Sequence, residues 1–137
     1  MIKSEGIELE FSDSISFEIS GKLQHVGIDN WKITINNKQI AGRQRFAMAH
    51  EFAHYCLHRN YDDNFLDVTF FISKDVESNI EKEANEFAYN LLIPESLIRK
   101  QIYSGVTSIA ELSQLFNVTP LAMKIRLSSL GYKFKKQ

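Results

Sequence analysis

The sequence predicts an α+β fold in which a small twisted sheet packs on a pair of helices, with further helices at the C-terminal end. Three observations lead to this prediction. Residues 7–36 contain segments in which apolar and polar residues alternate, which is the pattern of half-buried strands. Residues 43–58 and 79–92 instead repeat apolar residues at helical spacing. The stretch after Pro94 is helical in pattern throughout.

Length and composition indicate an ordinary globular domain. The 137 residues suffice for one domain with its own core, and 44% of them are hydrophobic. The formal net charge of −1 argues against a broad polyanion-binding surface. A single cysteine, Cys56, excludes an internal disulfide and suggests a reducing compartment. Because the sequence shows neither a signal-peptide pattern nor an apolar run of the ~18 residues that span a bilayer, we expect a cytoplasmic protein.

The N-terminal segment predicts the sheet. Its alternating segments, each expected to form a strand, cover residues 7–11, 15–19, 22–28 and 31–36. Asp29 and Asn30 form a turn signal before the last of these strands. Trp31, Ile33 and Ile35 share one face of that strand, because side chains alternate between the two faces.

Two long helices are predicted in the middle of the chain. The first, residues 43–58, is apolar on most of its sides and is therefore expected to be buried. A loop over residues 60–79 should follow, holding one short strand at 68–72. The second helix covers residues 79–92 and ends before Pro94, which cannot continue a helix.

Three short helices are predicted beyond this proline, over residues 95–103, 108–116 and 119–130. Ser108, with Glu111 three residues later, fits a capping box. Thr119 is a helix cap with Pro120 in the first helical position, and Gly131 is the expected terminator.

The first long helix carries the motif His50-Glu51-x-x-His54. Two histidines four residues apart lie on one face of a helix, so both imidazoles can reach one ion. Glu51 could then act on a metal-bound water. Since His50 and His54 lie on an apolar side of the helix, they need polar partners there. A metal is one such partner, and backbone carbonyl groups are the other, so the motif alone does not decide between them.

Glu81 in the second long helix is the candidate third ligand, because a catalytic zinc usually has three protein ligands and a water. At ~100° per residue, Glu81 falls inside the apolar arc of its helix, whereas Glu83 falls outside it. The alternative for Glu81 is a salt bridge to Arg43 or Arg45. Asn85, one turn beyond Glu81, is placed to orient a liganding histidine through its other ring nitrogen.

The other histidines and the cysteine are assigned no metal. His58 lies eight residues beyond His50, which is ~12 Å along a helix and too far for easy convergence on one ion. We expect His58 to form hydrogen bonds or to compensate the helix dipole. His25 is expected to be a partly exposed strand residue, and Cys56 is expected to pack in the interior.

These motifs resemble the signatures of the ImmA/IrrE family of metallopeptidases. Residues 43–54 look like the first signature, and residues 81–94, which end in Leu-Leu-Ile-Pro, are similar to the second. The two signatures in this order are highly specific, and the resemblance covers about residues 5–131. It implies a compact zincin-like metallopeptidase core, which we place at residues 1–103. The residues that match the family's site are His50, His54 and Glu81 as zinc ligands and Glu51 as the catalytic glutamate.

The function predicted from these residues and from the resemblance is zinc-dependent hydrolysis of peptide bonds. Glu51 would take a proton from the metal-bound water and pass it to the leaving amine. The resemblance implies that the substrate is a helix-turn-helix repressor of a mobile element, a prophage or a stress regulon. Ile33, Thr34 and Ile35 are candidates for a sheet edge that aligns substrate by strand addition, with an ordinary core strand as the equal alternative. Manganese or iron could occupy the same ligands as zinc.

The competing prediction is a DNA-binding or protein-binding regulatory module with a structural metal. Residues 104–137 are expected to form a helix-turn-helix-like subdomain packed on the core. Positive charge there comes from Lys124, Arg126, Lys133, Lys135 and Lys136. Because the whole chain is slightly acidic and the subdomain carries Glu111, direct nucleic-acid binding is not expected.

Overall fold

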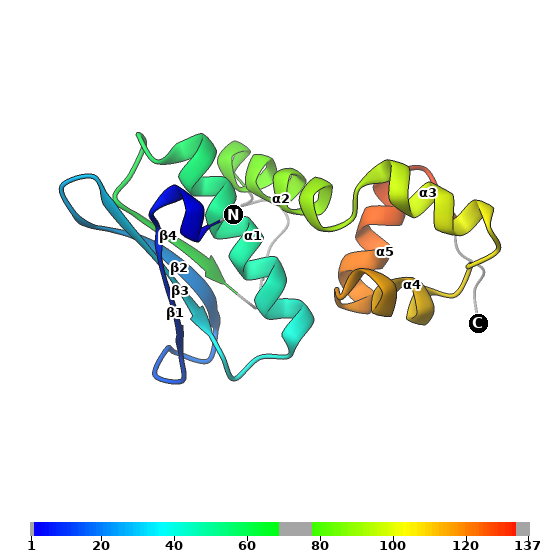
Figure 1. The fold of residues 1–137 in the computed structure, drawn as a ribbon, viewed down its shortest axis with the longest axis horizontal. Coiled ribbons are helices and arrows are strands. Elements are labelled where there is room, and N and C mark those ends of the chain that lie inside the picture. Colours follow the sequence, from blue (N-terminus) through cyan, green and yellow to red (C-terminus); the bar gives the residue numbers. More distant parts are fainter. Residues whose placement is uncertain (1, 69–77, 134–137) are drawn as a thin grey trace.

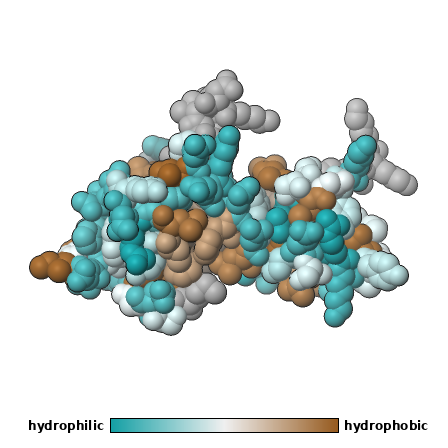
Figure 2. All heavy atoms as spheres, turned by 90° about the horizontal axis from the view of Figure 1, so that it is seen from above, coloured by the Kyte–Doolittle hydropathy of each residue, from teal (hydrophilic) through white to brown (hydrophobic). Residues whose placement is uncertain are grey.

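The structure, a computed structural model, describes residues 2–68 and 78–133. Within these ranges the chain forms a four-stranded sheet covered by two long helices, followed by three short helices that pack on one another (Figure 1). This arrangement confirms the predicted α+β class. Hydrophilic side chains cover much of the surface seen in Figure 2, and apolar ones gather near the middle of that view. Among the described helices, none is both long and apolar enough to cross a membrane.

The sheet has the strand order β1-β3-β2-β4. The strands are β1 (Glu8–Ser12), β2 (Ile19–Gly27), β3 (Asn30–Asn36) and β4 (Asn64–Val68). β1 runs parallel to β3, whereas β2 runs antiparallel to both β3 and β4. Asp29 adopts a left-handed φ of 60° in the turn between β2 and β3, as its turn signal predicted.

The prediction that residues 33–35 form a sheet edge is wrong, because β3 is an interior strand. Ile33 pairs with Leu9 of β1 on one side and with Leu23 of β2 on the other. Thr34 and Ile35 are likewise paired on both sides. Their backbone groups are therefore already bonded within the sheet and cannot take up a substrate strand.

Two other strand predictions need correction. Residues 15–18 lie outside the sheet, because the N–H of Ile19 bonds to the carbonyl of Ser16 and closes a turn just before β2. β4 begins at Asn64, inside the stretch predicted to be a loop, and ends at Val68. The rest of the strand predicted at 68–72 lies outside the described residues.

Helix α1 (Ala41–His58) packs against the sheet and against α2 (Asn79–Leu92). The core between them consists of Ile7, Leu23, Trp31, Ile33, Ile35, Ala47, Phe52 and Phe65. The sheet and α2 do not enclose α1 completely. Cys56 and Leu57 are exposed, so the expected burial of Cys56 is wrong.

The C-terminal helices are α3 (Glu95–Tyr103), α4 (Ile109–Phe116) and α5 (Pro120–Ser129). They enclose a second core of Ile93, Ile98, Leu112, Val118, Ala122, Met123 and Leu127. The predicted caps are present: the Ser108 hydroxyl accepts the N–H of Glu111, and the Thr119 hydroxyl accepts that of Ala122. α3 contributes Ile98 to this core, and the domain boundary at residue 104 stays a prediction.

The two parts of the chain are joined by specific contacts. The Arg45 guanidinium donates to the carbonyls of Phe116 and Asn117, at 2.7 and 3.0 Å, where α4 ends. A Cβ on Gly42 would lie 2.9 Å from the backbone nitrogen of Thr119, so this close approach requires glycine.

Part of the positive charge predicted for residues 104–137 does not face solvent in the structure. Arg126 is only 8% exposed, and its Nε donates to the carbonyl of Ile93 at 3.0 Å. It therefore holds the helices together rather than facing a ligand. Lys124 and Lys133 are exposed, whereas Lys135 and Lys136 lie outside the described residues.

Candidate metal centre

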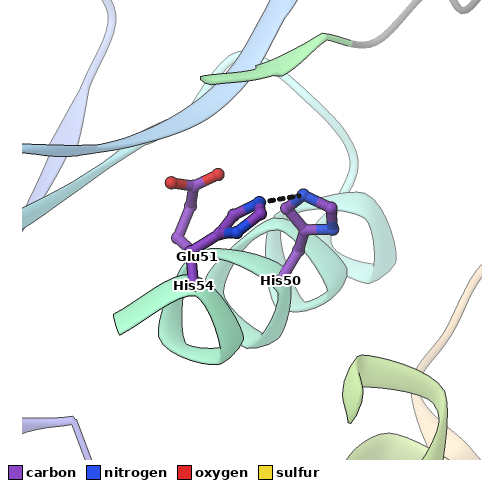
Figure 3. A group of neighbouring side chains, drawn as sticks. All are labelled: His50, Glu51 and His54. Atoms are coloured by element: carbon purple, nitrogen blue, oxygen red, sulfur yellow. Dashed lines mark hydrogen bonds between the residues drawn. The ribbon is translucent and has the colours of Figure 1, made fainter. Parts of the chain in front are cut away.

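Three side chains from α1 and α2 converge on one point. His50 and His54 extend from successive turns of α1, and their rings lie at 82° to each other with the two Nε2 atoms 3.1 Å apart (Figure 3). Glu81 comes from the first turn of α2, where the Ser78 hydroxyl caps the helix. The Glu81 carboxylate places one oxygen 3.0 Å from the His50 Nε2 and the other 3.0 Å from the His54 Nε2.

These atoms suit a tetrahedral metal ion. Ligand atoms about 2.0 to 2.1 Å from one zinc lie about 3.3 Å from each other, close to the spacing observed here. Two imidazole nitrogens and one carboxylate also form a typical ligand set of a catalytic zinc site, which leaves a fourth position for water. The side chains of His50 and His54 are 2% and 0% exposed, so the chain shields both imidazoles from solvent. The residues therefore fit a catalytic metal.

The charges of the site are mutually dependent. Burial would raise the pKa of Glu81, but hydrogen bonds and charges from His50 and His54 lower it to about 2. Burial lowers the pKa of His50, yet the hydrogen bond that the ring donates to Glu81 and the negative charges nearby outweigh it, so that pKa is raised. For His54, burial is the main cause of a lowered pKa. A metal that binds these atoms must displace the protons shared between the histidine nitrogens and the Glu81 carboxylate.

The second ring nitrogen of each histidine also has a partner. The Nδ1 of His50 lies 2.8 Å from the side-chain oxygen of Asn85, which can accept its proton. In a neutral His50, that bond leaves Nε2 unprotonated and aimed at the metal position. Asn85 thus stands where the helix angles placed it. The Nδ1 of His54 lies 3.0 Å from the Nδ1 of His58, so His58 forms hydrogen bonds as predicted, although the sequence did not indicate this partner.

Glu51 lies beside the three ligands without bonding to them. It is fully buried, and neither carboxylate oxygen has a hydrogen-bond partner within the described residues. The donor atoms of His50, Glu51 and His54 all lie within 4.8 Å of one another (Figure 3). Burial, followed by the charges of Asp67 and Glu81, raises the pKa of Glu51 well above its usual value. A desolvated carboxylate of this kind is suited to accept a proton from a neighbouring water.

Replacing Glu51 with glutamine should stabilise the metal-free protein at pH 7 by about 1–3 kcal/mol, because glutamine avoids the cost of ionising a buried carboxyl group. The raised pKa means that the folded state disfavours ionised Glu51, so the gain is present above pH 4.5, the ordinary value. Below pH 4.5 the group is protonated in both states and the gain disappears. Urea unfolding at pH 7 and pH 4 measures this difference, and equal gains at both pH values would contradict it.

An ion pair near Glu51 was missed by sequence reasoning. The Arg43 guanidinium donates to Asp67 of β4 at 3.0 Å, and Asp67 is only 7% exposed. The proposed salt bridge from Arg43 or Arg45 to Glu81 is therefore absent from the described contacts, since Arg43 pairs with Asp67 and Arg45 caps α4. The sequence signal that could have predicted this ion pair is the charged Asp67 within the short apolar run of residues 65–68. β4 also places Phe65 against the His54 ring, with the ring centroids 4.6 Å apart.

His25 lies away from this centre, as predicted. It is exposed on β2, stacks on Trp31 and hydrogen-bonds to Asp63.

The fold and the site together define a class of protein. Its features are a helix with the His-Glu-x-x-His motif, a second helix that supplies a glutamate, and a small mixed sheet beneath these helices. The family model described as the IrrE N-terminal-like domain, a peptidase family, matches residues 2–128, and the chain belongs to this family.

A curated relative is similar over most of the chain. The chain is 29% identical over 119 residues to Metallopeptidase ImmA of Bacillus subtilis (strain 168). The match covers 83% of this chain and 66% of that protein, so the chain spans slightly less than two thirds of the relative's length.

Proposed function

We propose that the chain is a zinc-dependent endopeptidase that cleaves a helix-turn-helix transcriptional repressor of a mobile element, a prophage or a stress regulon. The observation that carries the proposal is the convergence of His50, His54 and Glu81 next to Glu51, which is buried and has no hydrogen-bond partner in the part of the chain that the structure describes. Membership of a peptidase family supports the activity, as does the name of the Bacillus subtilis relative. A repressor substrate would place the reaction in the cytoplasm.

Each residue of the centre has a task in this reaction. His50, His54 and Glu81 would hold the metal, which supplies a Lewis acid and an activated water when bound. Glu51 would act as the general base toward an attacking water and as the general acid toward the amine that leaves. Because Glu51 is desolvated and its pKa is raised, it holds the proton more readily than an exposed carboxylate would. An unpaired base next to three ligands is unnecessary in a structural metal site, so it favours catalysis.

The substrate strand belongs on β4 rather than on β3 in this proposal. β4 lies at the end of the strand order, with β2 on one side and no partner strand on the other within the described residues. Its Phe65 packs on the His54 ring, so this edge runs next to the metal position. A peptide added to β4 would bond through its backbone and lie close to Glu51.

The test is a cleavage assay with the helix-turn-helix repressor that is encoded nearest to this protein. The purified protein, reconstituted with zinc, is incubated with the repressor, and the products are identified by mass spectrometry. We expect one defined cut that a chelator prevents and added zinc restores. Parallel reconstitution with manganese and iron identifies the metal that supports the highest rate. An intact repressor after prolonged incubation with the zinc-loaded protein would rule out this substrate.

A further inference from the structure

His58 is a buried histidine outside the three-ligand set. It lies at the last position of α1 and is 2% exposed. Its Nδ1 lies 3.0 Å from the Nδ1 of His54, and its Nε2 lies 3.0 Å from the carboxylate of Glu83 on α2. Both ring nitrogens of His58 therefore have partners, and the ring connects a metal-site histidine to a carboxylate.

The direction of these hydrogen bonds follows from the task of His54. To offer the lone pair of its Nε2 to a metal, a neutral His54 must carry its proton on Nδ1. Among the described residues, the acceptor for that N–H is the Nδ1 of His58, which must then be unprotonated. His58 accordingly carries its own proton on Nε2 and donates it to Glu83. The two bonds thus point the same way, from His54 toward the carboxylate.

We propose that His58 and Glu83 are positioning residues that fix the tautomer and ring orientation of His54 and thereby raise the metal affinity of the site. The proposal rests on the metal centre of the proposed function. A histidine whose second nitrogen donates to a well-placed acceptor is a more basic and better oriented ligand. Successive hydrogen bonds also polarise one another in a buried site, so the carboxylate of Glu83 acts on His54 through His58.

α2 supplies three polar groups that complete the site on α1. Glu81 binds at the metal position, Asn85 accepts from His50, and Glu83 accepts from His58. The two histidines are held differently, because His50 meets a neutral amide directly whereas His54 reaches a charged carboxylate through a second imidazole. Since the Glu83 side chain is 59% exposed, water competes with it, and its contribution should be smaller than that of His58.

The experiment compares two replacements of His58 that separate hydrogen bonding from packing. His58→Phe keeps an aromatic ring against Tyr61 and removes both hydrogen bonds. His58→Gln loses the ring but keeps an oxygen that accepts and an N–H that donates. Glu83→Gln removes the terminal charge. Glu86→Gln is the matched control, because it makes the same change at an exposed position of α2.

The readout is the zinc dissociation constant, measured by competition with a chromophoric chelator, together with the visible absorption spectrum of the cobalt(II)-loaded protein. We expect His58→Phe to weaken zinc binding by about 10- to 100-fold and to alter the cobalt spectrum. His58→Gln should stay within a few-fold of wild type, and Glu86→Gln should match wild type. Glu83→Gln should weaken binding by a smaller factor and should add no loss in the His58→Phe background.

Two results with the His58 variants would overturn the proposal. One is zinc binding by His58→Phe as tight as that of wild type. The other is a larger loss in His58→Gln than in His58→Phe, because that order indicates a packing role. If His58→Phe does not fold, the zinc affinities of Glu83→Gln and Glu86→Gln are compared instead. Equal affinities of these two variants would show that His58 and Glu83 do not position His54. A wild-type protein that binds no zinc would instead remove the proposed metal centre itself.

Discussion

Replacing Glu51 with glutamine should leave zinc bound and slow peptide cleavage by at least about 100-fold, the lower range for loss of a positioned acid–base group. Glutamine has nearly the same shape, so His50, His54 and Glu81 should keep their places. It cannot take a proton from the metal-bound water, and it cannot return one to the leaving amine. Zinc stoichiometry and the cleavage rate, measured on the same preparation, separate these two effects.

The appropriate control for this variant is Glu111→Gln in α4, which removes an equal charge at an exposed position in the second part of the chain. That protein should cleave at the wild-type rate. Cleavage by Glu51→Gln at an unchanged rate would show that Glu51 is not the base, even with a zinc-loaded site.

Glu81→Gln should weaken zinc binding by more than about 100-fold. Structural zinc sites with four ligands bind with about 10–16 kcal/mol, which corresponds to about 3 kcal/mol for each ligand. The variant keeps the size of the side chain but loses the charge that neutralises the ion. Because His50 and Glu81 are 31 positions apart and lie on different helices, the bound metal also joins α1 to α2. Zinc should therefore raise the unfolding temperature of the wild type much more than that of the variant.

Chelator competition and thermal unfolding with and without zinc measure both effects. Glu51→Gln is the control for zinc affinity, because it removes the proposed base and should leave the zinc ligands in place. If Glu81→Gln binds zinc as tightly as Glu51→Gln does, Glu81 is not a ligand and the third position must be assigned again.

Helices were predicted better than strands because their signals are local. The ranges 79–92 and 95–103 agree with α2 and α3 at both ends, since Ser78 caps one helix and Pro94 separates the two. β4 was missed because Asp67 interrupts its apolar pattern. Asp67 is buried there only because Arg43, 24 positions earlier, pairs with it. Such a pairing depends on how the chain folds back, which a short window of sequence does not contain.

The same reasoning applies to the site. Helical periodicity decides which residues share a face, and this was enough to place His50, His54, Glu81 and Asn85. The periodicity of residues along a strand does not reveal which strands lie next to it in the sheet, so the interior position of β3 was not predicted. The distance along α1 separated His58 from the ligand set. Its contact with Glu83, however, depends on how α1 and α2 are aligned, and that alignment is set by packing.

The exposure of Cys56 gives this chain a single site for thiol-specific chemical labelling. The thiol lies on α1, two residues after His54, yet it faces solvent. A maleimide probe would attach at this one position because the chain has no other cysteine. Burial of part of the side chain raises the pKa of the thiol, so coupling will be faster at mildly alkaline pH. Fluorescence or spin-label signals from this position would report movements of α1 during substrate binding without altering a residue of the centre.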